Sequence, residues 1–312
     1  MIEVAGLTKT YGAVQAVNDL SFAVRPGRVT GFLGPNGAGK STTMRCILGL
    51  DRPTAGRATI GGSEYGAIDR PLTKVGALLD AKWVHPNRTA RDHLRWLAVA
   101  SGIPVGRADE CLAAVGLTDA ARKKAGGFSL GMAQRLGIAG ALLGDPGVLL
   151  FDEPVNGLDP EGIVWVRTFM KSLAAQGRTV FVSSHLLAEM ALTADDVVIV
   201  GRGHLVWNGT MADFIAQNSE HTVRVRSPRD RELAQALTSR GLAVDAAAEA
   251  APGGGGRIVL TVRGATSDAV GEIAAAEGLP LAELAPQSSS LEQVFMRLTG
   301  GAVEYRGTGG IG

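Results

Sequence analysis

The chain has 312 residues, 46% of them hydrophobic, and its 31 basic and 30 acidic residues give a net charge of +1. This length is enough for one large domain and a smaller one, each with its own core, and the balanced charge argues against nucleic acid as the main partner. The apolar runs are far shorter than the ~20 residues of a membrane-spanning helix and the N-terminus lacks a signal-peptide pattern, so we expect a folded, soluble protein that stays in the cytoplasm.

The first motif is a glycine-rich loop at residues 34–42, where GPNGAGKST matches the pattern G-x-x-x-x-G-K-[S/T]. A short apolar strand is predicted before it, over 28–34, and a helix after it, over 41–50. Glycines permit backbone angles closed to other residues, so successive N–H groups can face one anion at the helix N-terminus. We therefore expect a nucleoside triphosphate site, in which Lys40 neutralises the outer phosphates and Ser41 ligates Mg²⁺. The residues expected around the phosphates are Gly34, Pro35, Asn36, Gly37, Ala38, Gly39, Lys40, Ser41 and Thr42.

A serine and a glycine stand at the start of a second helical pattern, in FSLGMAQR at residues 128–135. Ser129 is a favourable helix N-cap, the dipole of the following helix favours negative charge, and the backbone at Gly131 can approach a phosphate closely. By itself the pattern predicts a capped helix and identifies no ligand.

Two acids end the apolar run GVLLFDEP at residues 147–154. The run is typical of a central strand in a covered parallel sheet, and Pro154 ends it because proline cannot donate to the sheet. Successive side chains on a strand point to opposite faces, so Asp152 and Glu153 are expected to differ in role. We assign Asp152 to Mg²⁺, directly or through water, and Glu153 to the attacking water as general base. Without the phosphate loop, two solvated acids at a strand end would be the preferred interpretation.

A histidine follows the next predicted strand, RTVFVSSH at residues 178–185. In a doubly wound sheet the end of such a strand is the edge that faces the ligand, where the ring of His185 could hydrogen-bond the terminal phosphate. A lone histidine at such a position is more often a cap or a surface residue. The turn NGLDP at residues 156–160 carries no further signal by itself.

Beyond residue 218 the pattern changes and no catalytic constellation is found. Alternating or apolar segments predict strands over 221–227, 242–249, 257–263 and 279–286, and helical spacing predicts helices over 231–241, 267–278 and 288–300. The order βαββαβ suggests a ferredoxin-like module with an added helix. The glycine run at 253–256 and the glycine-rich tail are expected to be flexible.

Together these motifs resemble those of the ATP-binding subunits of ABC transporters, in the same order and over roughly residues 2–218. The resemblance implies an α/β, P-loop NTPase nucleotide-binding domain of the ABC type, with an inserted helical subdomain, that hydrolyses ATP with Mg²⁺. It implies that Ser129 and Gly131 of one chain close on the γ-phosphate held by another, so that a homodimer encloses two ATP molecules. It also implies that Tyr11 stacks on adenine and that Asp159 lies at the dimer seam, although Tyr11 could equally be a core aromatic residue.

Three positions depart from the usual pattern of this family. Asp80 stands where a glutamine usually reaches Mg²⁺ and water; its carboxylate can still serve a hard cation but is one methylene shorter and charged. Leu130 stands where a glycine is usual, and Met132 replaces a polar residue. With Leu130 and Met132 at these positions, the segment resembles that of a bacterial subgroup of these ATPases, which is similar to the daunorubicin- and bacitracin-resistance exporters.

The expected organisation is an ABC-type ATP-binding domain at 1–218 with its helical subdomain at about 82–143, a small α+β domain at 219–300 and a flexible tail at 301–312. We expect the chain to power export of a drug or other amphipathic small molecule through a separate permease, at the cytoplasmic side of the membrane. The small domain is expected to stabilise the dimer or to regulate it. The alternatives are a soluble ABC-type ATPase that acts on ribosomes or DNA, and a regulatory module that binds ATP without hydrolysis.

Overall fold

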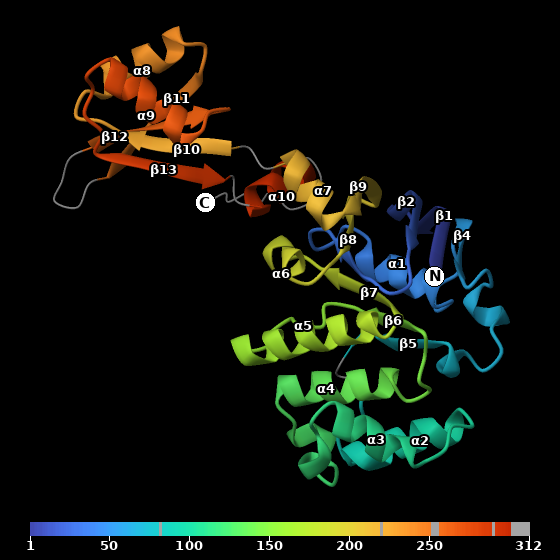
Figure 1. Cartoon of the computed structure of the whole chain (residues 1–312). Coiled ribbons are helices and arrows are strands. Elements are labelled where there is room, and N and C mark those ends of the chain that lie inside the picture. Colours follow the sequence, from blue (N-terminus) through green and yellow to red (C-terminus); the bar gives the residue numbers. More distant parts are fainter. Residues whose placement is uncertain (81–82, 219–220, 251–255, 289–290, 301–312) are drawn as a thin grey trace, which may run out of the picture. The chain divides into compact units, whose positions relative to one another are not determined.

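The computed structural model describes residues 1–80, 83–218, 221–250, 256–288 and 291–300 (Figure 1). They form two compact units: Met1–Phe214 together with the described residues from Phe295 on, and Ile215–Val294. The tail at 301–312 and most of the glycine run, which the sequence predicts to be flexible, lie outside the described residues.

The first unit is built on a six-stranded sheet with the order β5-β6-β7-β3-β8-β9. Neighbouring strands pair in parallel except β9, which runs antiparallel to β8 at one edge. Strands β3, β6, β7 and β8 are buried along their whole length, which explains the continuous apolar runs in the sequence. The bounds are β3 Val29–Leu33, β5 Val75–Leu78, β6 Val148–Phe151, β7 Thr179–Ser184, β8 Asp196–Gly201 and β9 His204–Thr210.

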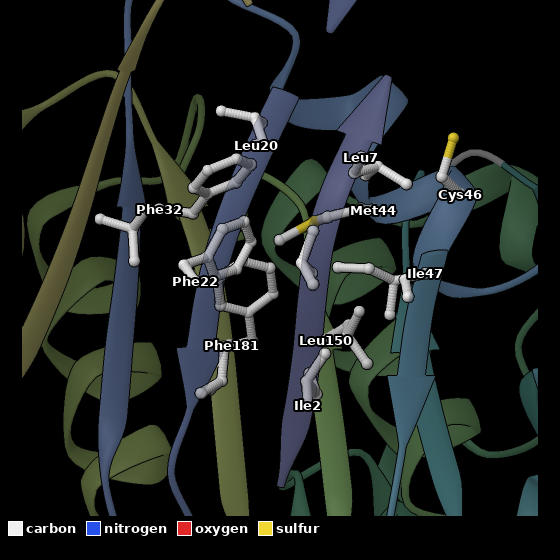
Figure 2. Packing of buried hydrophobic residues seen from close by; sticks show 14 of the residues in the cluster. Ile2, Leu7, Leu20, Phe22, Phe32, Met44, Cys46, Ile47, Leu150 and Phe181 are labelled. Carbon is white, nitrogen blue, oxygen red and sulfur yellow. The ribbon is translucent and has the colours of Figure 1, made fainter. Parts of the chain in front are cut away.

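A second, antiparallel sheet of three strands has the order β2-β1-β4, with β1 at Ile2–Tyr11, β2 at Val14–Val24 and β4 at Ala55–Ile60. Its side chains share one core with the large sheet and with helix α1, Lys40–Ile47. Figure 2 shows this core, in which the rings of Phe22, Phe32 and Phe181 lie 5.2–5.7 Å apart between their centroids. Burial of one face of α1 in this core fixes the direction of the helix, and therefore the position of its N-terminus.

Helices inserted between β5 and β6 form a separate layer of the first unit, in which α2 and α3 pack on α4 (Figure 1). Side-chain caps begin α2, α4 and α5, from Thr89, Ser129 and Asp159 respectively. Within the described part of the chain, no helix is both long and apolar enough to cross a membrane.

The inserted helices are α2 Ala90–Ala100, α3 Arg107–Ala114 and α4 Leu130–Ala141. The helices that follow β6 include α5 Pro160–Ala175, α6 Leu187–Ala191, α7 Met211–Asn218 and α10 Leu291–Gly300, and short 3₁₀ turns lie at Tyr65–Ala67, Pro71–Thr73, Thr118–Ala120 and Ala125–Gly127.

The second unit contains an antiparallel sheet with the order β11-β12-β10-β13. Buried side chains of α8 and α9 pack with those of the strands in one core, so the βαββαβ order predicted from the sequence is confirmed. The last strand begins at Glu283, not at Leu279, because Leu279 closes α9 with a hydrogen bond to the Ala274 carbonyl and Pro280 has no N–H to donate. The bounds are β10 His221–Arg226, α8 Asp230–Ser239, β11 Ala243–Ala250, β12 Gly256–Arg263, α9 Ser267–Ala276 and β13 Glu283–Ser288.

Candidate functional site

The predicted site residues follow strands that are neighbours in the large sheet. The order β6-β7-β3 brings together the acids after β6, His185 after β7 and the glycine-rich loop after β3. Because these strands are parallel, all three segments lie at the carboxyl edge, where open α/β sheets bind their ligands.

The glycine-rich loop is pressed against the backbone of neighbouring segments. A Cβ at Gly34 would lie 2.6 Å from the Val200 carbonyl oxygen, and one at Gly39 would lie 2.4 Å from the Ala16 carbonyl oxygen. Gly39 also has a φ of 96°, in the left-handed region that favours glycine. These two glycines are therefore required by space and by backbone conformation.

Lys40 is buried, with 6% of its surface exposed. Its Nζ donates to the carbonyl oxygens of Gly34, at 2.7 Å, and Pro35, at 3.2 Å, and lies 3.3 Å from Oε1 of Glu153. The first N–H groups of α1 have no partner inside the helix, and together with the ammonium they make this end of α1 suitable for phosphate.

Glu153 has a φ of 47°, which is uncommon for a residue with a side chain and costs about 1–3 kcal/mol. Its N–H donates to the Ser183 hydroxyl oxygen at 2.9 Å, which holds this conformation. The carboxylate lies between two cationic or titratable groups: Oε2 is 2.9 Å from Nδ1 of His185, and Oε1 faces Lys40. Oε1 is buried and accepts no hydrogen bond from the described residues, and it faces the Lys40 ammonium at 3.3 Å.

Asp152 points elsewhere and is held by different groups. Its N–H donates to the Leu78 carbonyl at 2.8 Å, and its Oδ1 accepts a hydrogen bond from the Ser183 hydroxyl. The side chains of the two acids make different contacts, as predicted. Alternation along a strand, the predicted cause, is wrong, because β6 ends at Phe151 and neither acid belongs to it. The left-handed backbone at Glu153 separates them. Ser183 is not recognisable as a site residue from its sequence surroundings; the pairing of Phe151 with Val182 places it, the next residue of β7, beside Asp152.

The start of α4 lies against the loop that follows the acids. The Ser129 hydroxyl accepts a hydrogen bond from the Met132 N–H at 3.3 Å, which confirms the predicted N-cap. The buried side chain of Gln134 donates to the Pro154 carbonyl at 2.8 Å. Gln134 is likewise not among the site residues predicted from the sequence. No hydrogen bond or ion pair joins Ser129 or Gly131 to Lys40 in the parts of the chain that the structure covers.

Three further predicted residues lie outside this cluster of contacts. Tyr11, at the end of β1, is 45% exposed, which excludes the core-aromatic alternative. Asp159 caps α5 by accepting a hydrogen bond from the Gly162 N–H at 2.9 Å. Asp80 is exposed two residues after β5, which pairs in parallel with β6.

The donor set fits Mg²⁺. Mg²⁺ in nucleotide sites is held by one or two carboxylates or hydroxyls together with phosphate oxygens and water, not by a cage of protein ligands. Ser41 follows the phosphate loop and Asp152 lies at the same sheet edge, so a hydroxyl and a carboxylate are present for such a site.

A groove of about 320 Å³ lies where β5 meets α2 and α4. Trp83 and Trp96 line it, although they are 64% and 54% exposed. His93 also lines it and is buried, with an Nδ1 that has no hydrogen-bond partner among the described residues. Burial, and then the nearby charge of Arg88, lower the pKa of His93 below its ordinary 6.5.

Comparison with known proteins gives matches in both units. Residues 17–156 match the family described as ABC transporter, and residues 221–292 match a domain of unknown function, DUF8746. The chain is 38% identical to the bacitracin transport ATP-binding protein BcrA of Enterococcus faecalis over 225 residues, which cover 71% of this chain and 73% of that protein. It is 44% identical to the BcrA protein of Bacillus licheniformis over 209 residues, covering 66% and 68%.

A solved structure has the same fold as the first unit. It is the dimeric structure of a post-hydrolysis state of the ATP-binding cassette MJ0796 bound to ADP and Pi, with a TM-score of 0.62 and 25% identity over 68% of this chain and 99% of that chain. The sequence-based fold class is therefore confirmed for the nucleotide-binding domain.

Proposed function

We propose a transport function for this chain, which belongs to the ABC transporter family as an ATP-binding subunit that hydrolyses ATP. The chain powers export of a drug or other amphipathic small molecule through a separate permease. The contact set of Lys40, Glu153 and His185 at one sheet edge is the observation that carries the catalytic part of this proposal. The names of the bacitracin transport relatives support the substrate class.

Binding of ATP is assigned to the phosphate loop and to Tyr11. The N–H groups at the start of α1 donate to phosphate oxygens, and the Lys40 ammonium exchanges its carbonyl partners for the outer phosphates. The exposed ring of Tyr11 offers a face on which adenine can stack. Ser41, Asp152 and Asp80 are assigned as the protein ligands of Mg²⁺, which neutralises charge on the phosphates when bound.

Hydrolysis is assigned to Glu153 as general base. Its buried Oε1 accepts a proton as the water oxygen attacks the γ-phosphorus, and the bond from that phosphorus to the ADP oxygen breaks. The other carboxylate oxygen, Oε2, lies 2.9 Å from Nδ1 of His185, and this contact positions the ring for a hydrogen bond to the terminal phosphate.

The homodimer is assigned from a second candidate phosphate-binding element on the chain, at the start of α4. Ser129 and Gly131 begin α4, whose N-terminus favours negative charge, yet neither bonds to Lys40 in the described part of the chain. We propose that they close on the γ-phosphate held by a second copy, with Asp159 at the seam between the copies. ATP hydrolysis per chain should then fall as the protein is diluted, because each site needs its partner. A monomeric preparation with a dilution-independent rate would contradict the dimer.

Ser129 permits a sharper test of the same interface. Ser129→Arg places a bulky side chain where α4 would meet the second copy, so it should spare ATP binding and abolish hydrolysis. Ser129→Ala adds no bulk at the interface; it removes the cap, at a cost of about 1 kcal/mol of stability, and the hydroxyl proposed to meet phosphate, so its hydrolysis should fall less than that of Ser129→Arg. Wild-type hydrolysis by both variants would leave Ser129 as a helix cap alone.

The permease contact is assigned to the groove beside β5 and the segment at residues 80–89. Exposed tryptophans over an apolar groove mark an interaction site, and the groove suits the apolar face of a helix from a membrane subunit. A tagged chain expressed with its neighbouring genes should retain a hydrophobic subunit. Trp96→Ala should weaken this association, and Val99→Ala, exposed on the same helix outside the groove, is the control. Co-purification of ribosomes or DNA in place of a membrane protein would favour the soluble ATPase alternative.

A further inference from the structure

The ring of Tyr11 is held at two places by its own chain. Its hydroxyl donates to Oδ2 of Asp51 at 2.5 Å. The Nζ of Lys9 lies 4.7 Å from the ring centroid, and this ammonium is itself fixed by donation to the Arg52 carbonyl at 2.8 Å. The side chain is nevertheless 45% exposed, so part of the ring surface remains accessible.

Asp51 is held in turn by helix α1. The Arg45 guanidinium donates to both carboxylate oxygens, at 2.7 Å from Nε to Oδ2 and 3.0 Å from the terminal nitrogen to Oδ1. Such a two-point contact fixes the carboxylate in orientation as well as position. Arg45, and then the Tyr11 hydroxyl, lower the pKa of Asp51 to about 2, so the carboxylate is charged at neutral pH.

We propose that Asp51, with Arg45 and Lys9, positions the Tyr11 ring as a one-sided platform for the adenine base. This inference rests on the proposed stacking of adenine on Tyr11. Lys9 covers one face of the ring by a cation–π contact, which leaves the opposite face for the base. Asp51 fixes the far end of the ring before nucleotide arrives, so less freedom of the side chain is lost on binding.

The arrangement also connects the two ends of the nucleotide site. Arg45 belongs to the helix that begins with Lys40 and Ser41, at the phosphate loop. One rigid helix therefore sets the position of the phosphate groups at its first turn and, through Arg45 and Asp51, the position of the adenine platform near its last turn. Asp51, Arg45 and Lys9 are positioning residues, since they act on the base only through Tyr11.

The test compares ADP with pyrophosphate as ligands of the full-length chain, by calorimetry, because neither is hydrolysed and only ADP carries the base. Asp51→Ala should weaken ADP binding roughly 5–10-fold, through loss of a charge-assisted hydrogen bond, and leave pyrophosphate binding within about twofold. Asp69→Ala, an exposed aspartate elsewhere, is the matched control and should change neither. Equal weakening of both ligands by Asp51→Ala would reduce Asp51 to a structural partner of α1 and overturn the proposal.

Two substitutions of Tyr11 separate the proposal from its premise. Tyr11→Phe keeps the ring and removes the anchored hydroxyl, so it should weaken ADP binding as Asp51→Ala does, and the double variant should be no weaker than either single one. Tyr11→Ala should weaken ADP binding further. If Tyr11→Ala weakens ADP but Tyr11→Phe and Asp51→Ala do not, the anchoring role is wrong and the stacking role stands. If Tyr11→Ala has no effect, the stacking premise itself is wrong.

Discussion

Leu130, in the first turn of α4, occupies the space that a side chain at Gly157 would need: a Cβ built on Gly157 would lie 2.6 Å from Cδ2 of Leu130. Gly157 also has a φ of 68°, where an L side chain is strained. The large residue at 130 is thus matched by the absence of a side chain at 157. The contact joins the helix that begins with Ser129 to the loop between the acids and α5.

Gly157→Ala should therefore lower the free energy of unfolding by about 1–2 kcal/mol, chiefly from the unfavourable φ, because Cδ2 of Leu130 is the end of a flexible, exposed side chain that can move aside. Leu130→Ala in the same chain should recover the part that is due to the clash. Chemical denaturation of the two single variants and the double variant measures this coupling. Additive losses would mean that the two residues do not compete for space.

Glu153→Gln should lower kcat at least ~100-fold, because an amide cannot take the proton of the attacking water. The amide still fills the space beside Lys40 and His185, so ATP should bind and hold a long-lived dimer that gel filtration detects. Glu64→Gln, at an exposed glutamate, is the control. Unchanged turnover of Glu153→Gln would remove Glu153 from the role of base.

Ser183→Ala should lower both stability and kcat. The hydroxyl of Ser183 accepts from the Glu153 N–H and donates to Asp152; its removal leaves a partly buried N–H without this acceptor, at a cost of about 1 kcal/mol. The left-handed turn that aims Glu153 loses its support, so kcat should fall more than the KM for ATP changes. Ser183→Thr, which keeps the hydroxyl, should restore part of kcat. A variant that only unfolds more easily, with kcat intact, would make Ser183 a packing residue.

The pH dependence of stability should contain a contribution from His93. Because burial lowers the pKa of His93, the unfolded chain binds a proton at this residue below about pH 6.5 while the folded chain does not. The stability contribution of the neutral ring is therefore present above that pH and is lost as the pH falls. Denaturation at pH 7.5 and pH 5.5 should show a smaller loss for His93→Gln than for the wild-type chain. His85→Gln, at an exposed histidine, is the control, and an equal effect of both variants would contradict the assignment.

The parts of the site that the sequence predicts are those encoded within a few neighbouring residues. The phosphate loop is recognisable because its glycines, Lys40 and Ser41 occupy nine consecutive positions between a strand and a helix. The N-cap role of Ser129 is local in the same way. The apolar runs also predict strands of a covered parallel sheet whose ends face the ligand, but that β6 and β7 are neighbours, and with them Glu153 and His185, is known only from the structure.

The parts that the sequence does not predict depend on contacts between distant segments. The direction of the Glu153 side chain follows from a left-handed residue that Ser183 holds across the sheet. Asp51 lies 40 positions from Tyr11 in the chain, and nothing in the residues around it indicates that it accepts the Tyr11 hydroxyl. A propensity or a motif describes one segment, whereas these contacts exist only after two segments have packed.

The hydrogen bonds of Lys40 have a consequence for the interval between two rounds of hydrolysis. When ADP and phosphate depart, the ammonium returns to acceptors that its own chain supplies, the carbonyls of Gly34 and Pro35 and the carboxylate of Glu153. The ammonium thus keeps polar and charged partners in the interval, and Glu153 stays in the ion pair until the next nucleotide draws Lys40 away.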